Sequence, residues 1–200
     1  MNRLRFMTAY LVGPMDHDRE SGKEWRDVMG PWLHEEKNCI VVDPYDKPMK
    51  SVSAVDALED EANHQKVVSA IATKTDEGYD FAEEKMKVVR STDLRIVDHA
   101  AFEVVNLDLD KRPCGTYDEL FMGNSQKKPI ITMCPQGKSE VPPWLFGTYP
   151  HRMMFDSWGN VQDYLDYIDT APDSKIETLG RWVFFDFEQQ IRNIMARIDK

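Results

Sequence analysis

Carboxylates gather at the points where apolar stretches of this sequence end. The segment Asp108–Asn124 reads DLDKRPCGTYDELFMGN and follows the apolar run FEVVNL, so a polar turn and an acidic helix start come directly after a predicted strand. In an open α/β sheet, ligands bind at the carboxyl ends of the strands. A carboxylate there can act as an acid, a base or a nucleophile. The acidic residues near such strand ends are Asp16, Asp43, Asp93, Asp108, Asp110 and Glu119.

Carboxylates in different surroundings suit cleavage at an anomeric carbon, where the transition state is oxocarbenium-like. One carboxylate attacks or shields the cation, and another manages the proton of the leaving group. The sequence lacks the motifs of phosphate-binding loops, serine hydrolases and metal sites. The sequence has no GxGxxG or GxxxxGK[ST] loop and no GxSxG elbow, and its five histidines are scattered without metal-ligand spacing. We therefore expect chemistry that uses no metal and no cofactor.

Apolar and amphipathic stretches alternate along the chain and predict the scaffold that positions these carboxylates. The predicted strands are Leu4–Val12, Cys39–Val42, Phe102–Leu107, Pro129–Met133 and His151–Phe155. The predicted helices are Glu24–Leu33, Ala54–Ala72, Phe81–His99, one that opens at Tyr117–Gly123, and Val161–Tyr167. Pro31 is expected to end or kink the first helix. Strand, helix and strand at the N-terminus form a parallel crossover unit, which predicts a single α/β domain over residues 1–200.

Three segments stand apart from this alternation. Tyr45–Asp80 is polar, and is interpreted either as a solvated insertion or as a lid or rim over the site. Pro135–Pro150 carries Trp144, Phe146 and Tyr149, which suggests a loop over a ligand or a subunit contact. Residues 170–200 form a C-terminal extension that ends in an amphipathic helix.

Composition narrows the class of partner. Lys and Arg total 25 against 35 Asp and Glu, a formal charge of -10, which disfavours a nucleic-acid polymer but not a small nucleoside. The three cysteines are an odd number without a CxxC spacing, which indicates a reduced, cytoplasmic protein. The N-terminus does not resemble a signal peptide, and no apolar stretch approaches the roughly 20 residues of a membrane helix.

Three motifs occur in an order that resembles a known enzyme family. They are Tyr10-Leu11-Val12-Gly13-Pro14 at the end of the first strand, Asp93-Leu94 on the helix before the third strand, and Gly115-Thr116-Tyr117-Asp118-Glu119-Leu120, followed by KKPII. Together they are similar to the nucleoside 2-deoxyribosyltransferase superfamily, which includes the 2'-deoxynucleoside 5'-phosphate N-hydrolases. The resemblance covers residues 4–165, with 45–80 poorly matched.

The resemblance implies a flavodoxin-like (Rossmann-like) parallel sheet of about five strands with helices on both faces. It implies that Glu119 is the nucleophile that forms a glycosyl-enzyme intermediate, that Tyr10 orients it, and that Asp93 contacts the base or manages its proton. The expected substrate-binding residues are Gly13, Pro14, Asp16, Asp108, Asp110 and Gly115.

The expected reaction is cleavage of the N-glycosidic bond of a 2'-deoxynucleoside with transfer to another nucleobase. Hydrolysis of a 2'-deoxynucleoside 5'-monophosphate is the alternative, and a non-catalytic nucleotide-binding module is the alternative from another class. Pro113 stands where the transferases have Asp and the hydrolases Ser, which weakens the case for a phosphate. Conversely, the basic residues after the first strand, Arg19, Lys23 and Arg26, could meet a phosphate at a helix N-terminus.

Each candidate also has a purely structural interpretation. Glu119 could be a first-turn residue favoured by the helix dipole, Asp93 a helix cap or surface residue, and Tyr10 a core side chain. Asp108 and Asp110 could simply form a turn. A homo-oligomer is expected, because the family completes its sites with a neighbouring subunit and the aromatic loop needs burial.

Overall fold

A single parallel sheet forms the centre of the protein. The structure is a computed structural model that describes residues 2–15, 19–47, 61–111 and 113–198. The strands are β1 (Thr8–Val12), β2 (Ile40–Val42), β3 (Phe102–Asn106), β4 (Ile130–Met133) and β5 (Met154–Phe155). They lie in the order β2-β1-β3-β4-β5, and all four pairings are parallel. This is the flavodoxin-like order, so the predicted fold class is confirmed.

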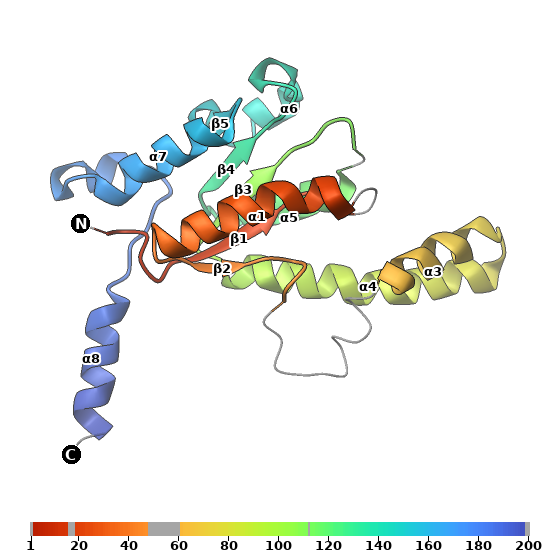
Figure 1. Cartoon of the computed structure of the whole chain (residues 1–200), viewed down its shortest axis with the longest axis horizontal. Coiled ribbons are helices and arrows are strands. Elements are labelled where there is room, and N and C mark those ends of the chain that lie inside the picture. The colour runs from red at the N-terminus through yellow and green to blue at the C-terminus, as the bar shows by residue number, and fades with distance from the viewer. Residues whose placement is uncertain (1, 16–18, 48–60, 112, 199–200) are drawn as a thin grey trace.

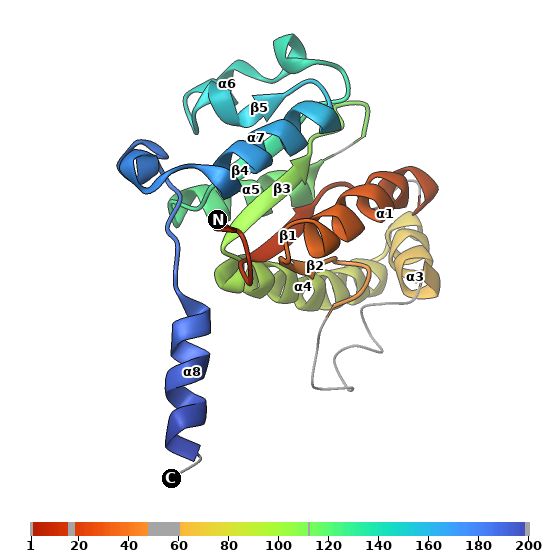
Figure 2. The same ribbon diagram turned by 60° about the vertical axis from the view of Figure 1, so that its left-hand side comes forward.

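Helices cover both faces of the sheet (Figures 1 and 2). The α-helices are α1 (Arg19–Glu35), α3 (Glu61–Ala72), α4 (Asp76–His99), α5 (Cys114–Ser125), α6 (Pro143–Phe146), α7 (Trp158–Thr170) and α8 (Phe187–Ile198). Three short 3-10 turns are η1 (Lys138–Glu140), η2 (His151–Met153) and η3 (Asp173–Thr178). Helices α1 and α7 share one face, where the rings of Trp25 and Trp158 stack 4.8 Å apart, and α4 and α5 share the other.

Strands β3 and β4 are buried along their whole length. Every residue of β3 and β4 is buried, as expected for parallel strands that helices cover on both sides. Strands β2 and β5 are the edges and are only 3 and 2 residues long. Short edge strands expose few unpaired backbone groups, which limits edge-to-edge association.

Strands β1 and β3 are neighbours at the point where the sheet changes its direction of growth. The chain runs outward from β1 to β2 and then crosses back to β3. In doubly wound sheets the crevice outside the carboxyl ends of these two strands is the usual ligand site. Tyr10 is paired in register with Glu103, so the two side chains lie on the same face of the sheet. This face is the one that α4 and α5 cover.

The helix boundaries differ from the predicted ones in informative places. Helix α1 runs through Pro31 to Glu35, because Met29 and Leu33 anchor it in the core on either side of the missing N–H. Helix α5 starts at Cys114 rather than Tyr117. The stretch interpreted as an insertion contains α3 and the start of α4, which pack as a helical hairpin, and Thr75 caps α4 by accepting a bond from Gly78 N. The part of the predicted helix before residue 61 lies outside the described residues.

The aromatic loop is only partly exposed. Trp144 is 80% exposed and Phe146 is exposed, as expected, but Tyr149 is buried and its hydroxyl bonds the Thr132 hydroxyl at 2.7 Å. Tyr149 therefore belongs to the hydrophobic core and not to the exposed part of this loop. Helix α8 projects from the body in both views (Figures 1 and 2). Among the helices of the described ranges, none combines the length and apolar character needed to cross a membrane.

Close packing of α5 against β3 at Gly123 fixes the height of this helix above the sheet. A Cβ atom at Gly123 would lie 2.0 Å from Glu103 Oε1, whereas a Cβ atom at Gly115 would meet nothing within 4 Å. We predict that Gly123→Ala lowers the free energy of unfolding by about 3 kcal/mol, because either the helix or the carboxyl must move. Gly115→Ala, on the same helix, should change it by less than about 1 kcal/mol. Urea denaturation of both variants tests this, and equal effects would contradict the close contact.

Candidate active site

A hydrogen bond between Tyr10 and Glu119 joins the first strand to α5. The Tyr10 hydroxyl donates to Glu119 Oε1 at 2.6 Å. Tyr10 is 0% exposed, and Glu119 is partly exposed. This bond holds the carboxyl of a partly exposed residue in a fixed direction. The structure therefore brings together two of the three residues that the sequence predicts to be catalytic.

Helix α5 places Glu119 in its second turn, not its first. The helix begins at Cys114, with Pro113 as its N-cap and no side-chain cap bond, and its first turn contains no acidic residue. The dipole effect is confined to the first turn. The interpretation of Glu119 as a dipole-stabilised first-turn residue was therefore wrong. Its neighbour Asp118 points to the surface and pairs with Arg90 at 2.6 Å.

The surroundings of Glu119 favour its protonated form. Burial raises the pKa of Glu119 to about 8; the hydrogen bond from Tyr10 opposes this shift, Asp93 adds to it, and Arg26 and Lys47 oppose it. Burial, Glu119 and Asp93 all raise the pKa of Tyr10, so its hydroxyl keeps its proton and acts as a donor. A carboxyl with a strongly raised pKa beside a donor and two cations is typical of a functional site.

Asp93 on α4 is paired with a lysine that the sequence did not single out. Lys47 Nζ lies 2.6 Å from Asp93 Oδ1, and the Lys47 side chain is almost fully buried. Since Asp93 also influences the pKa of both Tyr10 and Glu119, the three predicted catalytic residues share one electrostatic neighbourhood. Lys47 comes from the segment that was interpreted as insertion or rim, and it brings an ammonium group to this cluster.

Arg26 on α1 is buried and binds the end of the first strand. Its guanidinium donates to the carbonyl oxygens of Gly13 at 3.0 Å and Gly22, and its Nε lies 3.6 Å from Asp43 Oδ1. These contacts engage Arg26 within the protein, and its expected contact with a phosphate stays a prediction. Lys23 is bonded to both oxygens of Asp27. The side chain of Arg19 lies outside the described residues.

The predicted substrate-binding residues of the first loop have different surroundings. Gly13 is buried, and a Cβ atom there would approach Trp25 to 3.1 Å and Asn106 to 3.3 Å. Its role is thus close packing between the strand end and its neighbours. Pro14 is partly exposed at the same edge. Asp16 lies outside the described residues. Gly115 has open space beside it, as a position near a ligand would need.

Asp108 and Asp110 form hydrogen bonds within their own loop and to Gln136 in the loop after β4. Asp108 Oδ1 accepts from Asp110 N at 3.0 Å, and the Gln136 amide donates to Asp108 at 2.7 Å and to Asp110 at 2.9 Å. Gln136 in turn accepts from Leu109 N at 3.1 Å. These bonds tie the loop after β3 to the loop after β4. This geometry matches the turn-forming interpretation, and their role in substrate binding stays a prediction.

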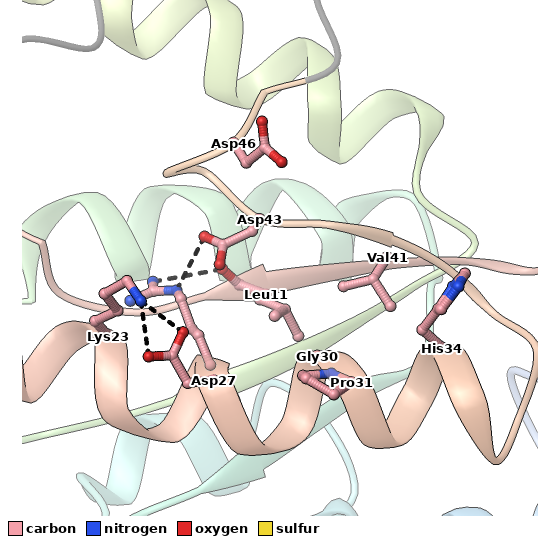
Figure 3. A pocket seen from close by; sticks show the side chains of 10 residues that line it. Leu11, Lys23, Asp27, Gly30, Pro31, His34, Val41, Asp43 and Asp46 are labelled. Carbon is pink, nitrogen blue, oxygen red and sulfur yellow. Dashed lines mark hydrogen bonds and ion pairs between the residues drawn. The ribbon is translucent and has the colours of Figure 1, made fainter.

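A groove of about 530 Å³ lies between α1 and β2 (Figure 3). Its lining includes Arg26 and Asp43 but none of Tyr10, Asp93 and Glu119. Burial raises the pKa of Asp43, and the Tyr45 backbone bond and Arg26 oppose this shift. Arg26, which also acts on the pKa of Glu119, is one of the residues that line this groove. Within the described ranges, no group of three His, Cys, Asp or Glu side chains is arranged to hold a metal ion.

Sequence reasoning missed two polar residues at this edge of the sheet, Lys47 and Asn106, and it also missed the structural role of Arg26. Asn106 ends β3, and its Oδ1 atom is buried without a hydrogen-bond partner among the described residues. An asparagine at the carboxyl end of a strand expected to be buried was a usable signal. Lys47 and Arg26 gave no such signal, because Lys47 lies in a polar stretch and Arg26 on an amphipathic helix.

The bond between Tyr10 and Glu119 predicts how stability depends on pH. Because the pKa of Glu119 is raised in the folded protein, the contribution of this carboxyl to stability falls as pH rises from the pKa of Glu119 in the unfolded chain through about 8, by at most about 1.4 kcal/mol per pH unit. Tyr10→Phe removes the donor that favours the carboxylate, so the fall should extend to higher pH, with a loss of about 1–3 kcal/mol where Glu119 is ionised. Urea denaturation between pH 5 and 10 measures it.

Tyr149→Phe is the matched control, since it removes a buried tyrosine hydroxyl whose bond goes to Thr132. It should lower stability by about 1 kcal/mol with little change in the pH dependence. If both variants show the same pH dependence, the bond between Tyr10 and Glu119 does not control the ionisation of Glu119.

Among the comparisons with known proteins, only the one with solved structures finds a likeness. No protein-family profile and no curated protein sequence matches the chain. Among solved structures, a 2-deoxyribosyltransferase from the psychrotolerant bacterium Bacillus psychrosaccharolyticus aligns with 78% of this chain and 91% of its own, at 16% sequence identity and a TM-score of 0.49. The functional conclusion below is therefore drawn from the side chains and not from this likeness.

Proposed function

We propose that this protein is a nucleoside 2-deoxyribosyltransferase-like enzyme that cleaves the N-glycosidic bond of 2'-deoxynucleosides through a covalent intermediate on Glu119. The observation that carries the proposal is the carboxyl of Glu119, a partly exposed residue, held at 2.6 Å by the buried Tyr10 hydroxyl. A carboxylate fixed in this way suits attack on an anomeric carbon. The resemblance of the three sequence motifs adds to this proposal.

The reaction has two steps. In the first, a Glu119 oxygen attacks C1' of the sugar, and the electrons of the C1'–N bond pass to the departing base. In the second, a nitrogen of another nucleobase attacks C1' and releases the Glu119 carboxylate, which retains the anomeric configuration. Water in place of the second base gives hydrolysis. Tyr10 keeps the attacking carboxylate in position in both steps.

Lys47 and Asp93 form an ion pair that protonates and orients the leaving base. Lys47 Nζ is 2.6 Å from Asp93 Oδ1 in a nearly buried position. The ammonium group is a proton source beside Asp93, the carboxylate that the family resemblance assigns to the base. Asp93 can orient the base by accepting its N–H groups. This assigns the proton transfer to the pair rather than to Asp93 alone.

A nucleoside fits the site better than a nucleotide. Of the basic residues after β1 whose side chains are described, Arg26 is bonded to backbone carbonyls and Lys23 to Asp27. Asp93 is among the charged groups that act on Glu119, and its negative charge opposes a phosphate dianion. The transferase reaction on free deoxynucleosides is therefore our first choice and the 5'-monophosphate hydrolase the second.

Product analysis tests the proposal directly. The protein is incubated with deoxynucleosides and a foreign nucleobase, and products are separated by chromatography. We expect exchange of bases, and a deoxyribosyl adduct on the protein in mass spectra. Glu119→Ala should lower kcat at least about a thousandfold, because no other group can replace the nucleophile. The rate should rise with pH toward about 8, since burial raises the pKa of Glu119 and the ionised form reacts.

The neighbouring carboxylate provides the control for this experiment. Asp118→Asn changes a carboxylate on the same helix that pairs with Arg90 at the surface, and should leave kcat within about twofold. Absence of both base exchange and free base with the wild-type protein, or an unchanged rate in Glu119→Ala, would refute the enzymatic proposal.

A non-catalytic nucleotide-binding module is the second candidate. It is favoured by the raised pKa of Glu119, which keeps much of this carboxyl protonated at neutral pH, and by Pro113 in place of the family's Asp or Ser. Ligand-induced thermal stabilisation without turnover, preserved in Glu119→Gln, would support this second function over the first.

We also propose that the protein forms a homo-oligomer through α8. The side chains of Ile191, Ile194, Met195 and Ile198 are all at least half exposed and recur at helical spacing, so they form one apolar stripe. A 12-residue helix is marginal on its own, and Arg5 ties this one to the body through Glu188. A second copy of the chain would cover the stripe.

Light scattering tests the oligomer. We expect a mass above that of the 23.2 kDa monomer for the wild-type protein. Ile191→Lys combined with Ile194→Lys should lower the association constant at least about tenfold, because it places charge in the apolar stripe. Asn193→Lys lies on the opposite side of α8 and is the control. A monomeric wild type, or equal effects of the two variants, would contradict association through α8.

A further inference from the structure

Glu103 is a carboxyl in the middle of the central strand. It lies between Phe102 and Val104 in β3, is 0% exposed, and neither of its side-chain oxygens has a hydrogen-bond partner among the described residues. An ionised carboxylate in such surroundings is strongly disfavoured, because it loses water without gaining donors. The neutral acid is therefore the form that this position accommodates, and burial raises the pKa of Glu103 to about 8.

The fold makes a specific place for this carboxyl. Helix α5 crosses β3 at Gly123, where an added Cβ atom would lie only 2.0 Å from Glu103 Oε1. Gly123 follows Glu119 by four residues, so the carboxyl of Glu103 lies one helical turn from Glu119 on the same side of α5. Glu103 is also paired in register with Tyr10, the residue that holds Glu119.

The charged and titratable groups around Glu103 come from several elements. They are Tyr10 on β1, Glu119 on α5, Lys128 before β4, and Tyr149 after α6. Lys128 lowers the pKa of Glu103, but its ammonium donates to the carbonyl oxygens of Val97 and Asp98. The Tyr149 hydroxyl bonds Thr132. None of these groups donates to Glu103.

The two carboxyls therefore differ in what stabilises their ionised forms. Glu119 receives the Tyr10 hydrogen bond and lies near Arg26 and Lys47. Glu103 has no donor in the described structure and is repelled by an ionised Glu119. When Glu103 and Glu119 together lose their first proton, Glu119 becomes ionised and Glu103 keeps the remaining proton.

We propose that Glu103 is a positioning residue that keeps its proton until after Glu119 has ionised, and so makes Glu119 the carboxyl that reacts. This inference rests on the proposed function for the role of Glu119. When Glu119 is ionised and ready to react, Glu103 is neutral, so no second negative charge lies near the nucleophile. Once Glu119 is bound to the sugar its charge is lost, and the repulsion on Glu103 is lost with it.

Infrared titration of the carboxyl C=O band tests the order of ionisation. In the wild-type protein, buried carboxyls should lose protons in a lower and an upper step. Glu119→Gln should remove the lower step and move the remaining one down by about one pH unit, because the repelling charge is gone. Glu103→Gln should remove the upper step and leave the lower in place. Asp43 is present in all variants, so its signal cancels when the spectra of two variants are subtracted.

The proposal would be overturned if Glu103→Gln lost the lower titration step, or if it kept both steps. If Glu103→Gln does not fold, the spectra of Glu119→Gln decide alone. A Glu119→Gln protein in which no buried carboxyl keeps a proton would also overturn the proposal. These spectra need no turnover, so they stand even if the wild-type protein is inactive, in which case the proposed function fails separately. Where turnover is found, the pH profile of Glu103→Gln should lose its alkaline break, and a retained break would refute the link to the reaction.

Discussion

Burial of the Glu119 carboxyl beside the Tyr10 hydroxyl is the constraint on which the rest of the site depends. Removing a carboxylate from water is unfavourable, and one hydrogen bond does not offset it. The structure places the cations of Arg26 and Lys47 nearby, and each brings its own carboxylate, Asp43 or Asp93. Buried ionic clusters of this kind are weak evidence for stability, because apolar residues would pack as well. They are better explained by a reaction that needs a carboxylate of unusual reactivity.

The flavodoxin-like strand order explains how distant segments reach this cluster. Tyr10 comes from β1, Asp93 from α4 and Glu119 from α5, and the crossover connections bring all three to the face of the sheet beside β1 and β3. Arg26 adds rigidity from the opposite helix layer, because its bond to the Gly13 carbonyl fixes the chain where it leaves β1. The proposed site is thus attached to regular elements and not to loops alone, which favours a constant geometry for its side chains.

The sequence predicted the strands and the fold class because parallel strands covered on both faces are nearly continuous apolar runs. Tyr10, Asp93 and Glu119 were found through the order of three short motifs, and their grouping in space agrees with that order. Helix starts were predicted less well, since α5 begins at a Pro113 cap that forms no side-chain bond and gives no signal. Lys47 could not be predicted, because a lysine in a polar stretch has the pattern of a surface residue whether or not tertiary contacts bury it.

Glu103 and Gly123 show most clearly where the sequence departs from what stability alone favours. An apolar residue at position 103 would remove an unsatisfied buried carboxyl, and an alanine at position 123 would suit the helix better by about 1 kcal/mol. The two unfavourable choices meet at one contact, since the glycine leaves the space that the carboxyl fills. Departures from local rules that fit one another in this way are expected at functional sites rather than at random positions. Because this contact lies one turn of α5 from Glu119, the electrostatic control of that carboxyl is the function that best explains both residues.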